Sequence, residues 1–338
     1  MRNLVTGVAG FVGTNLAAEL LARGEDVIGI DNLSRRGTEH NLKWLQGLDS
    51  RRFSFVQGDI RDAALLARIM PGNDAVFHLA AQVAVTTSIT DPRADFEVNA
   101  LGTLNVLEAC RLQSSHPAVV FTSTNKVYGG LEQYEVVDSG DRWRIPSLPQ
   151  GLTEDTLLDF HSPYGCSKGC ADQYVRDYAR IFGIPSVVFR MSCIYGPHQF
   201  GNEDQGWVMH FAASCLKRRP INVYGDGRQV RDILYVGDLV AALLRARDVA
   251  PSAPGLILNI GGGPSQAIPI QAVLDMASAR GTPPVSVDYG PWRWGDQKVY
   301  ISCIAKAKEV LGWRPQMGVD DGVEAIFRWA EHNLDLFP

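Results

Sequence analysis

Three glycines near the start of the chain, Gly7, Gly10 and Gly13, constrain the fold more than any other feature. They follow Leu4–Thr6, which we predict to be a strand, and precede a helix predicted over 14–23. In such a turn the first glycine permits the sharp reversal, the second allows a pyrophosphate to approach the backbone, and the third lets helix and strand pack closely. The spacing is G-x-x-G-x-x-G and not the commoner G-x-G-x-x-G, and a structural turn without a ligand is the alternative.

Strand and helix patterns alternate through the first half of the chain. After the glycine loop we predict strands over 26–30, 53–57, 75–79, 118–122 and 186–189, and helices over 63–69, 95–113 and 163–182. Ser162 and Pro163 suit the start of the last helix, and Gly183 suits its end. This alternation predicts an α/β fold with a Rossmann-type doubly wound parallel sheet.

The second half is less regular and is expected to form a smaller α/β domain that binds substrate. It contains one clear strand, Leu256–Ile260, and helices around 268–280, 302–311 and 319–333. We therefore predict a dinucleotide-binding domain over 1–190, to which the chain returns around 230–262, and a second domain over 191–338.

Composition narrows the possible partners. The net charge of −5 gives no basic surface for nucleic acid or anionic membrane, and no apolar run is long enough to span a bilayer. The six cysteines are scattered, and only Cys166 and Cys170 lie at helical spacing, which predicts no metal site. A reduced, cytoplasmic protein is the simplest interpretation.

Acidic residues after the second and third strands indicate which dinucleotide is bound. Asp31 suits the adenosine ribose hydroxyls and favours NAD over NADP. Arg35 and Arg36 could instead hold a 2′-phosphate, which Asp31 would repel. Asp59 is placed to meet the adenine, and it could equally cap the following helix.

Tyr164 and Lys168 lie one helical turn apart and can run acid–base chemistry. A phenol titrates near pH ~10, and we expect a neighbouring ammonium and a nicotinamide ring to lower that pKa. The phenolate can then accept a proton from a sugar hydroxyl while hydride leaves the same carbon. The fifth strand ends in the hydroxyl-bearing run 122–124, at the sheet edge where ligands bind in such folds.

Together these motifs resemble the extended short-chain dehydrogenase/reductase superfamily of nucleotide-sugar epimerases and dehydratases. The resemblance rests on the glycine loop, Asp31, 78–81, Thr124 with 127–129, and the Tyr164/Lys168 pair, and it covers essentially the whole chain. It implies that Tyr164 is the acid/base, Lys168 holds the nicotinamide ribose, and Thr124 hydrogen-bonds the reacting oxygen. The implied NAD-binding residues are Gly7, Gly10, Phe11, Val12, Gly13, Asp31, Asn32, Asp59, Ile60, Leu79, Ala80, Ala81, Asn99, Tyr164 and Lys168.

The residues after Thr124 bear on the reaction. Related dehydratases carry an Asp-Glu pair there and decarboxylating relatives a Glu, whereas this chain has Asn125 and Lys126. Neither an amide nor an ammonium can act as a carboxylate base, which argues against both reactions and leaves epimerisation.

Longer strings are similar to one class in this superfamily, the CDP-tyvelose 2-epimerases, which invert C2 of CDP-paratose. These strings are 82–84, 86–88, 124–129, 131–134, 158–168 and 204–208. The resemblance implies a transient oxidation, in which hydride passes from C2 to tightly bound NAD and returns to the opposite face. A UDP-glucose-type 4-epimerase or another nucleotide-sugar oxidoreductase uses the same catalytic residues and remains open, as does a non-catalytic NAD-binding protein.

Substrate contacts are expected from both halves of the chain. Arg231 suits the diphosphate, because a guanidinium binds phosphate through two hydrogen bonds, and Lys298 stands where relatives have a second basic residue. The other expected contacts are Thr86, Ser88, Thr124, Asn125, Gln205 and Trp207. The long segment 130–160 could be a lid over the sugar. His78 is expected to be structural, whereas His161 precedes the catalytic helix and could touch the substrate, with a structural role as the favoured alternative. Relatives associate as homodimers or homotetramers, which we expect here by analogy.

Overall fold

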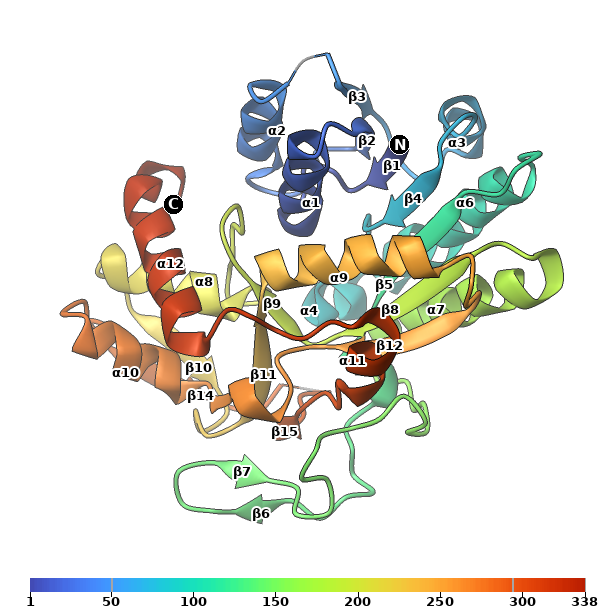
Figure 1. The fold of residues 1–338 in the computed structure, drawn as a ribbon. Coiled ribbons are helices and arrows are strands. Elements are labelled where there is room, and N and C mark those ends of the chain that lie inside the picture. Colours follow the sequence, from blue (N-terminus) through green and yellow to red (C-terminus); the bar gives the residue numbers. More distant parts are fainter. Residues whose placement is uncertain (50, 294, 338) are drawn as a thin grey trace. The chain divides into compact units, whose positions relative to one another are not determined.

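The computed structural model describes residues 1–49, 51–293 and 295–337, and the chain forms two compact units (Figure 1). The first unit consists of Met1–Val127, Ser162–Arg190 and Val240–Leu258. The second consists of Tyr128–His161, Met191–Leu239 and Asn259–Pro338. The sequence-based division at residue 190 left 128–161 in the first domain, whereas the structure groups that segment with the second unit.

A seven-stranded sheet forms the centre of the first unit. Its order is β12-β8-β5-β4-β1-β2-β3, and the pairs β4–β5, β1–β4, β1–β2 and β2–β3 are parallel. The strands are β1 (Arg2–Thr6), β2 (Asp26–Asp31), β3 (Phe53–Gln57), β4 (Ala75–His78), β5 (Ala118–Thr124), β8 (Ser186–Met191) and β12 (Leu256–Ile260). The order reverses between β1 and β4, which is the point where doubly wound sheets bind ligands at the carboxyl ends of their strands. The predicted Rossmann-type fold class is confirmed.

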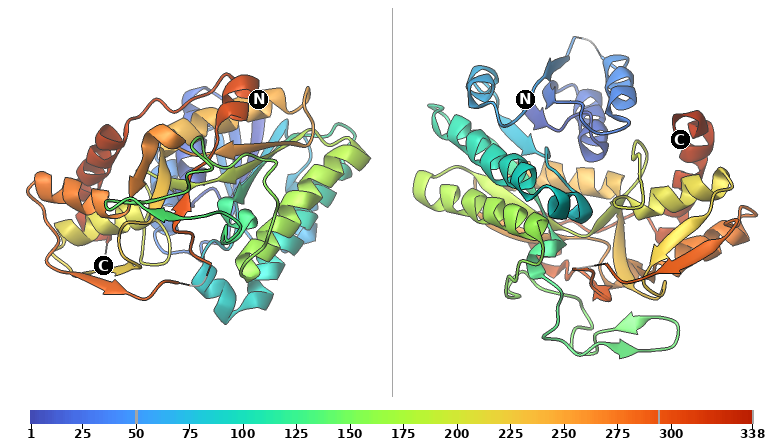
Figure 2. Two further views of the ribbon diagram at one scale, coloured as in Figure 1. Left: turned by 90° about the horizontal axis from the view of Figure 1, so that it is seen from below. Right: turned by 180° about the vertical axis from the view of Figure 1, so that it is seen from behind.

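Helices cover both faces of this sheet (Figures 1 and 2). The helices are α1 (Phe11–Ala22), α2 (Thr38–Gln46), α3 (Ala63–Ile69), α4 (Val85–Thr90), α5 (Pro92–Phe96), α6 (Gly102–Arg111), α7 (Pro163–Phe182) and α9 (Val236–Val249). One apolar core joins α3, α6 and α7 to the strands through buried side chains such as Leu66, Val106 and Val175. Burial of this face supplies most of the free energy that holds the layers together.

The helix expected over 95–113 differs from the structure. A π-helical turn, η1 (Glu97–Leu101), interrupts it between α5 and α6. A turn of this kind inserts one residue into the helix and often lies at a functional site. The helix predicted over 163–182 is confirmed as α7: the Gly165 amide donates to Ser162 Oγ at 3.2 Å, and Gly183 ends it with φ 69°.

The second unit has its own core and smaller sheets. Its strands are β6 (Val137–Asp138), β7 (Trp143–Arg144), β9 (Cys193–Tyr195), β10 (Ile221–Tyr224), β11 (Val230–Tyr235), β13 (Ala267–Pro269), β14 (Val287–Gly290) and β15 (Val299–Tyr300). Its helices are α8 (Trp207–Leu216), α10 (Gln271–Ala279), α11 (Ala305–Leu311) and α12 (Val319–His332). Strand β11 pairs with β9, β13 and β15. Phe211, Ile326 and Phe327 are among the buried side chains of the core.

The segment expected to be a lid carries a short antiparallel hairpin, β6–β7, which is tied to its own unit. Trp143 Nε1 donates to Asp226 Oδ2 at 2.8 Å, and Arg228 Nη1 donates to both Asp138 carboxylate oxygens at 2.9 and 2.8 Å. Farther along, the Asn259 amide donates to Glu154 Oε1 at 2.7 Å. These bonds anchor the segment at several points, which does not favour a freely opening lid.

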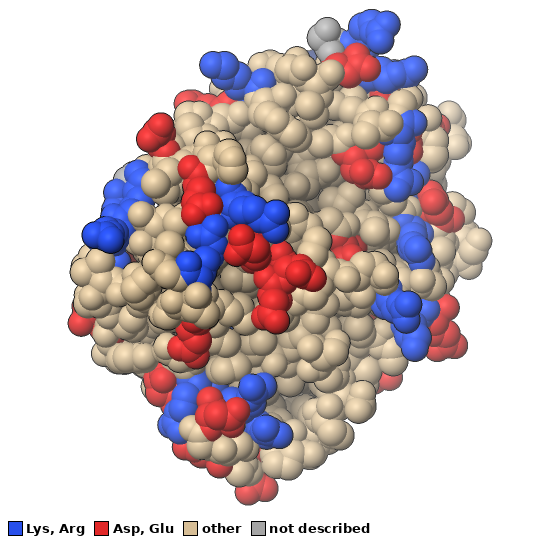
Figure 3. Space-filling model, turned by 60° about the vertical axis from the view of Figure 1, so that its left-hand side comes forward, with Lys and Arg blue, Asp and Glu red and all other residues tan. Residues whose placement is uncertain are grey.

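The surface carries no single-sign field on the face drawn in Figure 3, where acidic and basic side chains lie intermingled. Among the described residues, no helix combines the length and apolar character that crossing a membrane requires.

Candidate active site

The glycine loop lies at the carboxyl end of β1 and leaves no room for side chains. A Cβ atom at Gly13 would lie 2.1 Å from Gly7 O, and one at Gly7, where φ is +72°, would lie 2.8 Å from the Ala80 amide. Gly10 precedes α1 and has no side chain to accept the amides of Val12 and Gly13 in the first helical turn. Exposed backbone amides at a helix start are suited to an anion such as a pyrophosphate.

The acidic residues expected to bind the adenosine lie at the carboxyl ends of β2 and β3. The Asp31 carboxylate accepts the Ala9 amide at 3.0 Å and the Leu33 amide at 2.9 Å, and burial raises its pKa. Asn32 Nδ2 donates to Asp59 Oδ2 at 2.9 Å. The Asp59 pKa falls to about 2, chiefly because of its hydrogen bond with the Arg61 side chain.

Asp59 does not cap the following helix, which corrects one of its two expected roles. The cap of α3 is Asp62, whose side chain accepts the Leu65 amide at 2.9 Å. The neighbouring Ile60 is buried, and its carbonyl accepts Asn105 Nδ2 at 3.2 Å.

Hydrogen bonds from Thr6, His78 and Thr103 hold the backbone at the carboxyl end of β4 in place. Thr6 Oγ1 accepts the amides of Leu79 and Ala80 at 3.1 and 3.2 Å. His78 lies between Thr6 Oγ1, at 2.8 Å, and Thr103 Oγ1, at 2.9 Å, and burial followed by the charge of Lys168 lowers its pKa to about 3. His78 is therefore a neutral structural residue, as expected, and it orients the backbone that continues into Ala81.

Tyr164, Lys168 and Thr124 come together in the first unit. Their exposed fractions are 8%, 3% and 7%, and a side-chain hydrogen bond links Thr124 to the Tyr164 phenol. Lys168 Nζ lies 4.2 Å from the centroid of the Phe121 ring on β5. The Tyr164 amide donates to Ser88 Oγ at 3.1 Å. Ser88 is fully buried, so the structure gives it an environment different from the substrate contact expected from the sequence.

The pKa of Tyr164 in the protein chain alone lies above its ordinary value. This pKa is raised to about 12, chiefly by burial and to a smaller extent by the charge of Asp95, while the Thr124 hydrogen bond and the Arg35 charge oppose the shift. For the protein chain alone the pKa of Tyr164 shifts upward, because desolvation disfavours the phenolate; the expected lowering by Lys168 together with a nicotinamide ring stays a prediction. Burial lowers the pKa of Lys168 to about 7, and the charges of Asp172 and Asp95 oppose that shift.

A buried ion pair lies one helical turn beyond Lys168 and was not foreseen. Arg190 Nε and Nη2 donate to the two Asp172 carboxylate oxygens at 2.9 and 3.1 Å, and both side chains are almost inaccessible to solvent. The sequence signal was the i, i+4 spacing of Lys168 and Asp172 on a helix that needs a buried face.

Asn99 lies in the π-helical turn and connects it to α7. Its side-chain amide donates to the Gln82 carbonyl at 3.0 Å and to Ser167 Oγ at 3.0 Å, and its carbonyl accepts the Gln82 amide at 2.9 Å. These bonds position the loop after β4 against the helix that carries Tyr164.

Two hydroxyls of the first unit are buried without a hydrogen-bond partner among the described residues, and they belong to Thr86 and Ser123. Ser123 directly precedes Thr124 at the end of β5. Unpartnered buried hydroxyls are costly, which is typical of groups that meet a ligand. Asn125 is buried beside them and accepts the Thr124 hydroxyl at 3.3 Å.

The second unit contains four of the residues expected to contact the diphosphate and the sugar, namely Arg231, Lys298, Gln205 and Trp207. Arg231 on β11 is 7% exposed, and its guanidinium donates to the Val230 carbonyl at 2.8 Å. No acidic partner of Arg231 is found within the described ranges. A buried guanidinium that lacks an acid has the charge and the donors to hold a phosphate group.

The other three expected contacts of this unit differ in their surroundings. Lys298 is exposed, with Nζ 4.0 Å from the centroid of the Trp143 ring. Trp207 begins α8, and its Nε1 is buried without a partner in the part of the chain that the structure describes. The Gln205 amide donates to Asn202 Oδ1 at 2.9 Å.

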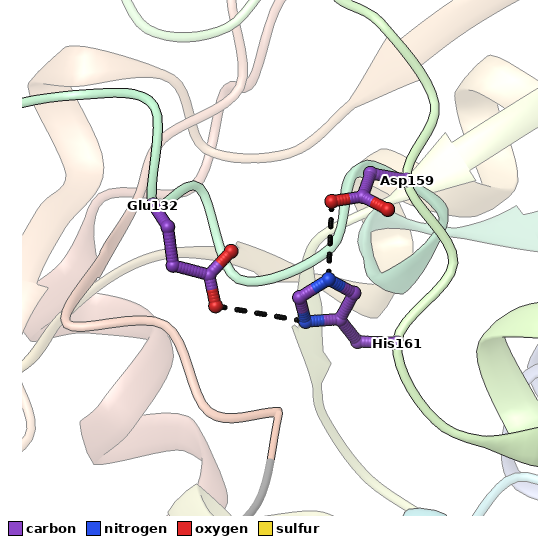
Figure 4. Close-up of side chains that lie close together, drawn as sticks. All are labelled: Glu132, Asp159 and His161. Carbon is purple, nitrogen blue, oxygen red and sulfur yellow. Dashed lines mark hydrogen bonds and ion pairs between the residues drawn. The ribbon is translucent and has the colours of Figure 1, made fainter.

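One group in the described chain, Glu132, Asp159 and His161, has the spacing of a metal site (Figure 4). Its ligand atoms lie within 4.8 Å of one another. His161 Nε2 lies 3.0 Å from Asp159 Oδ2, and Nδ1 lies 3.6 Å from Glu132 Oε1. Both imidazole nitrogens therefore face carboxylates. Through these contacts His161 connects Glu132, near the start of the 130–160 segment, with Asp159, near its end.

Comparison with known proteins shows the family. Residues 3–261 match the profile of the NAD dependent epimerase/dehydratase family. The chain belongs to this family. Its members' cofactor, NAD, suits the glycine cradle and the uncapped start of α1 described above. The protein is thus an NAD-dependent enzyme, as the motifs indicated.

Relatives of this family match along nearly the whole chain. A CDP-paratose 2-epimerase of Salmonella typhi is 42% identical, covering 97% of this chain and 99% of the relative. A UDP-glucose 4-epimerase of Mycolicibacterium smegmatis is 34% identical, covering 96% of both chains. The crystal structure of a Bacillus cereus UDP-glucuronic acid 4-epimerase with UDP-glucuronic acid and NAD superimposes with a TM-score of 0.85, at 29% identity, covering 98% of this chain and 100% of the other.

Proposed function

We propose that this protein is a nucleotide-sugar 2-epimerase that converts a CDP-paratose-type substrate to its C2-inverted, tyvelose-type product. The observation that carries the proposal is the 42% identity to a CDP-paratose 2-epimerase across 97% of the chain. The geometry of Thr124, Tyr164 and Lys168 supports the same chemistry, because it brings a hydroxyl, a phenol and an ammonium to one sheet edge.

The side chains of the first unit would do most of the chemical work. As the phenolate, which Lys168 and the positive nicotinamide ring of bound NAD would favour, Tyr164 would accept the proton of the C2 hydroxyl and later return it, while Thr124 would hold the same oxygen in place. Lys168 donates to the ribose next to the nicotinamide, and the glycine loop with Asp31 holds the rest of the dinucleotide. NAD supplies the hydride acceptor and donor. Because the oxidation is reversed within each turnover, no net redox change occurs.

The side chains around the sugar would select inversion over elimination. Asn125 and Lys126 follow Thr124 where dehydratases of the superfamily need carboxylates, although dTDP-glucose 4,6-dehydratases are among the relatives, at 33% identity. An amide and an ammonium cannot remove the carbon-bound proton that starts a dehydration. Thr86 and the hydroxyl of Ser123 would meet the sugar, since both are buried without partners in the described structure.

The second unit would bind the nucleotide. Arg231 is the proposed diphosphate anchor, Lys298 a second cation, and Gln205 and Trp207 the lining of the sugar or base pocket. A guanidinium buried without an acidic partner in the described chain supports the role of Arg231. A 4-epimerase acting on a UDP-glucose-type substrate is the second candidate, favoured by the 34% identity to a UDP-glucose 4-epimerase.

Proton NMR of CDP-paratose incubated with the purified protein, without added reductant, tests the proposal. We expect the H1 and H2 couplings of the C2-inverted sugar to appear. Tyr164→Phe is the matched control, because it keeps the ring and removes the phenol. Inversion of UDP-glucose at C4 with unchanged CDP-paratose would replace the 2-epimerase by the second candidate.

Self-association and location complete the proposal. Large apolar side chains stand exposed on the helices after β4 and on α7, and they include Ile89, Phe96, Tyr174 and Ile181. An exposed apolar face of this kind supports a homodimer or homotetramer. The cysteines carry free thiols, which suits the reducing cytoplasm. Light scattering after size-exclusion chromatography measures the oligomeric state.

A further inference from the structure

Asp95 on α5 is a carboxylate in the interior of the first unit. Its exposed fraction is 1%. Ser167 Oγ donates to Oδ2 at 2.5 Å, while Gln82 Nε2 and Asn99 Nδ2 donate to Oδ1 at 2.8 and 3.1 Å. All three donors are neutral, so they favour the ionised carboxylate without neutralising its charge.

The cation that interacts electrostatically with the Asp95 carboxylate is Lys168. Ser167, which holds Asp95, directly precedes Lys168 on α7. Burial raises the pKa of Asp95, while the hydrogen bonds from Ser167 and Gln82 and the charge of Lys168 oppose that shift. The other carboxylate that acts on Lys168 is Asp172, and Arg190 already binds both of its oxygens. Two carboxylates therefore act on Lys168. Asp172 is paired with the Arg190 guanidinium, whereas Asp95 is held by neutral donors.

We propose that Asp95 is a positioning residue that keeps Lys168 in its ammonium form and thereby sets the charge of the Tyr164–Lys168 pair. The inference rests on the proposed function in assigning Tyr164 and Lys168 their catalytic roles. Asp95 itself touches neither the substrate nor the reacting atoms. Ser167, Gln82 and Asn99 hold its carboxylate in place, and it acts through its charge.

Among the described residues, the titratable and charged groups that act on this pair besides Asp95 are Asp172, His78 and Arg35 of the first unit. Asp172 lies on the same helix as Lys168, His78 ends the neighbouring strand β4, and Arg35 follows β2. His78 is held neutral between two threonine hydroxyls, and Arg35 acts on Tyr164 with a sign opposite to that of Asp95. Removing the Asp95 charge therefore shifts Tyr164 and Lys168 in the same direction, toward a lower pKa.

Asp95→Asn removes the charge and is expected to fold. The new carbonyl oxygen can accept from Gln82 and Asn99, and the new amide can donate to Ser167 Oγ. The Ser167 hydroxyl can then donate to the Tyr164 carbonyl, which already lies 3.2 Å away. The buried hydrogen bonds are thus kept while the charge is lost. Asp95→Ser is a second neutral variant should the amide not be accommodated.

Lysine-selective 13C labelling tests the proposal on the protein as purified, with its cofactor. The chain has seven lysines, and the Cε signal of Lys168 is assigned by its loss in Lys168→Met. In Asp95→Asn we expect the titration midpoint of Lys168 to fall by about one pH unit, a tenfold change in its acid-dissociation constant. Asp91→Asn is the matched control, because Asp91 caps the same helix and asparagine caps equally well.

The outcomes separate a charge effect from a purely structural one. A midpoint that stays in place in both neutral Asp95 variants overturns the proposal, as does an equal shift in Asp91→Asn. Ser167→Ala keeps the carboxylate and should leave the midpoint within a few tenths of a unit of the wild type. The measurement needs no sugar turnover, so an inactive result with CDP-paratose would count against the proposed function and leave this test intact.

Discussion

Replacing Lys168 with methionine should stabilise the protein while abolishing its chemistry. Lys168 is 3% exposed, and burial lowers its pKa from 10.5 to about 7. Holding the ammonium in the interior therefore costs the native state about 5 kcal/mol at a pH below 7, from the roughly 1.4 kcal/mol that one pKa unit represents. The contact of the Lys168 ammonium with the Phe121 ring offsets about 2 kcal/mol of this cost. A methionine of similar length should gain about 3 kcal/mol at pH 6.

The sign of the pH dependence follows from the lowered pKa. Below the folded value both states carry the proton and the full penalty applies. Between pH 7 and 10.5 the unfolded chain binds more protons than the native one, so the wild type gains stability as the pH rises. The advantage of Lys168→Met should then shrink and vanish near pH 10.5.

Urea unfolding of both proteins at pH 6, 8 and 10 measures this difference. The slope against urea should be the same for both, because the surface exposed on unfolding is unchanged. Lys43→Met on the exposed side of α2 is the control, with an expected change within ~0.5 kcal/mol at each pH. A Lys168→Met variant that is less stable than the wild type at pH 6 would refute the reasoning, because it would show that the ammonium is net stabilising.

Three further predictions concern the same unit. Tyr164→Phe should lower turnover by about 10² to 10⁴ while bound NAD, measured after denaturation, is retained. Asp172→Asn leaves the Arg190 guanidinium buried without its acid and should lower the free energy of unfolding by ~3–5 kcal/mol, measured in urea. Gly13→Ala places a Cβ atom 2.1 Å from a backbone oxygen and should abolish NAD retention, whereas Gly24→Ala, with no atom within 4 Å, should cost only ~1 kcal/mol in stability.

Local signals account for the parts of the fold that the sequence predicted well. The helix over 163–182 was placed at both ends because a serine cap, an N-terminal proline and a left-handed glycine all act within one turn. The π-helical turn was missed because its cause is distant: Asn99 is held by Ser167, which lies 68 residues along the chain. Helix α2 was missed for a similar reason, since Asn41 Nδ2 donates to the Ala9 carbonyl of the glycine loop.

For the candidate site, too, some features could be predicted from the sequence and others could not. Residue types and spacing were enough to select Tyr164, Lys168 and Thr124, because their chemistry is specific and their positions follow recognisable strands and helices. The direction of the Tyr164 shift was not predictable, because it depends on how completely the phenol is buried. Asp95 carried no signal, since an aspartate in the first turn of a helix is ordinarily a solvent-exposed helix-start residue.

The winding path of the chain has a consequence for its synthesis. Strands β8 and β12 belong to the large sheet, yet each is translated only after a segment of the second unit has been made. Until residues 186–191 leave the ribosome, β5 is an edge strand whose unpaired backbone N–H and C=O groups can hydrogen-bond to a strand of another chain. The nascent chain therefore exposes a template for aggregation over a long stretch of elongation. A chaperone that shields such an edge would matter more for this protein than for one whose domains are continuous in sequence.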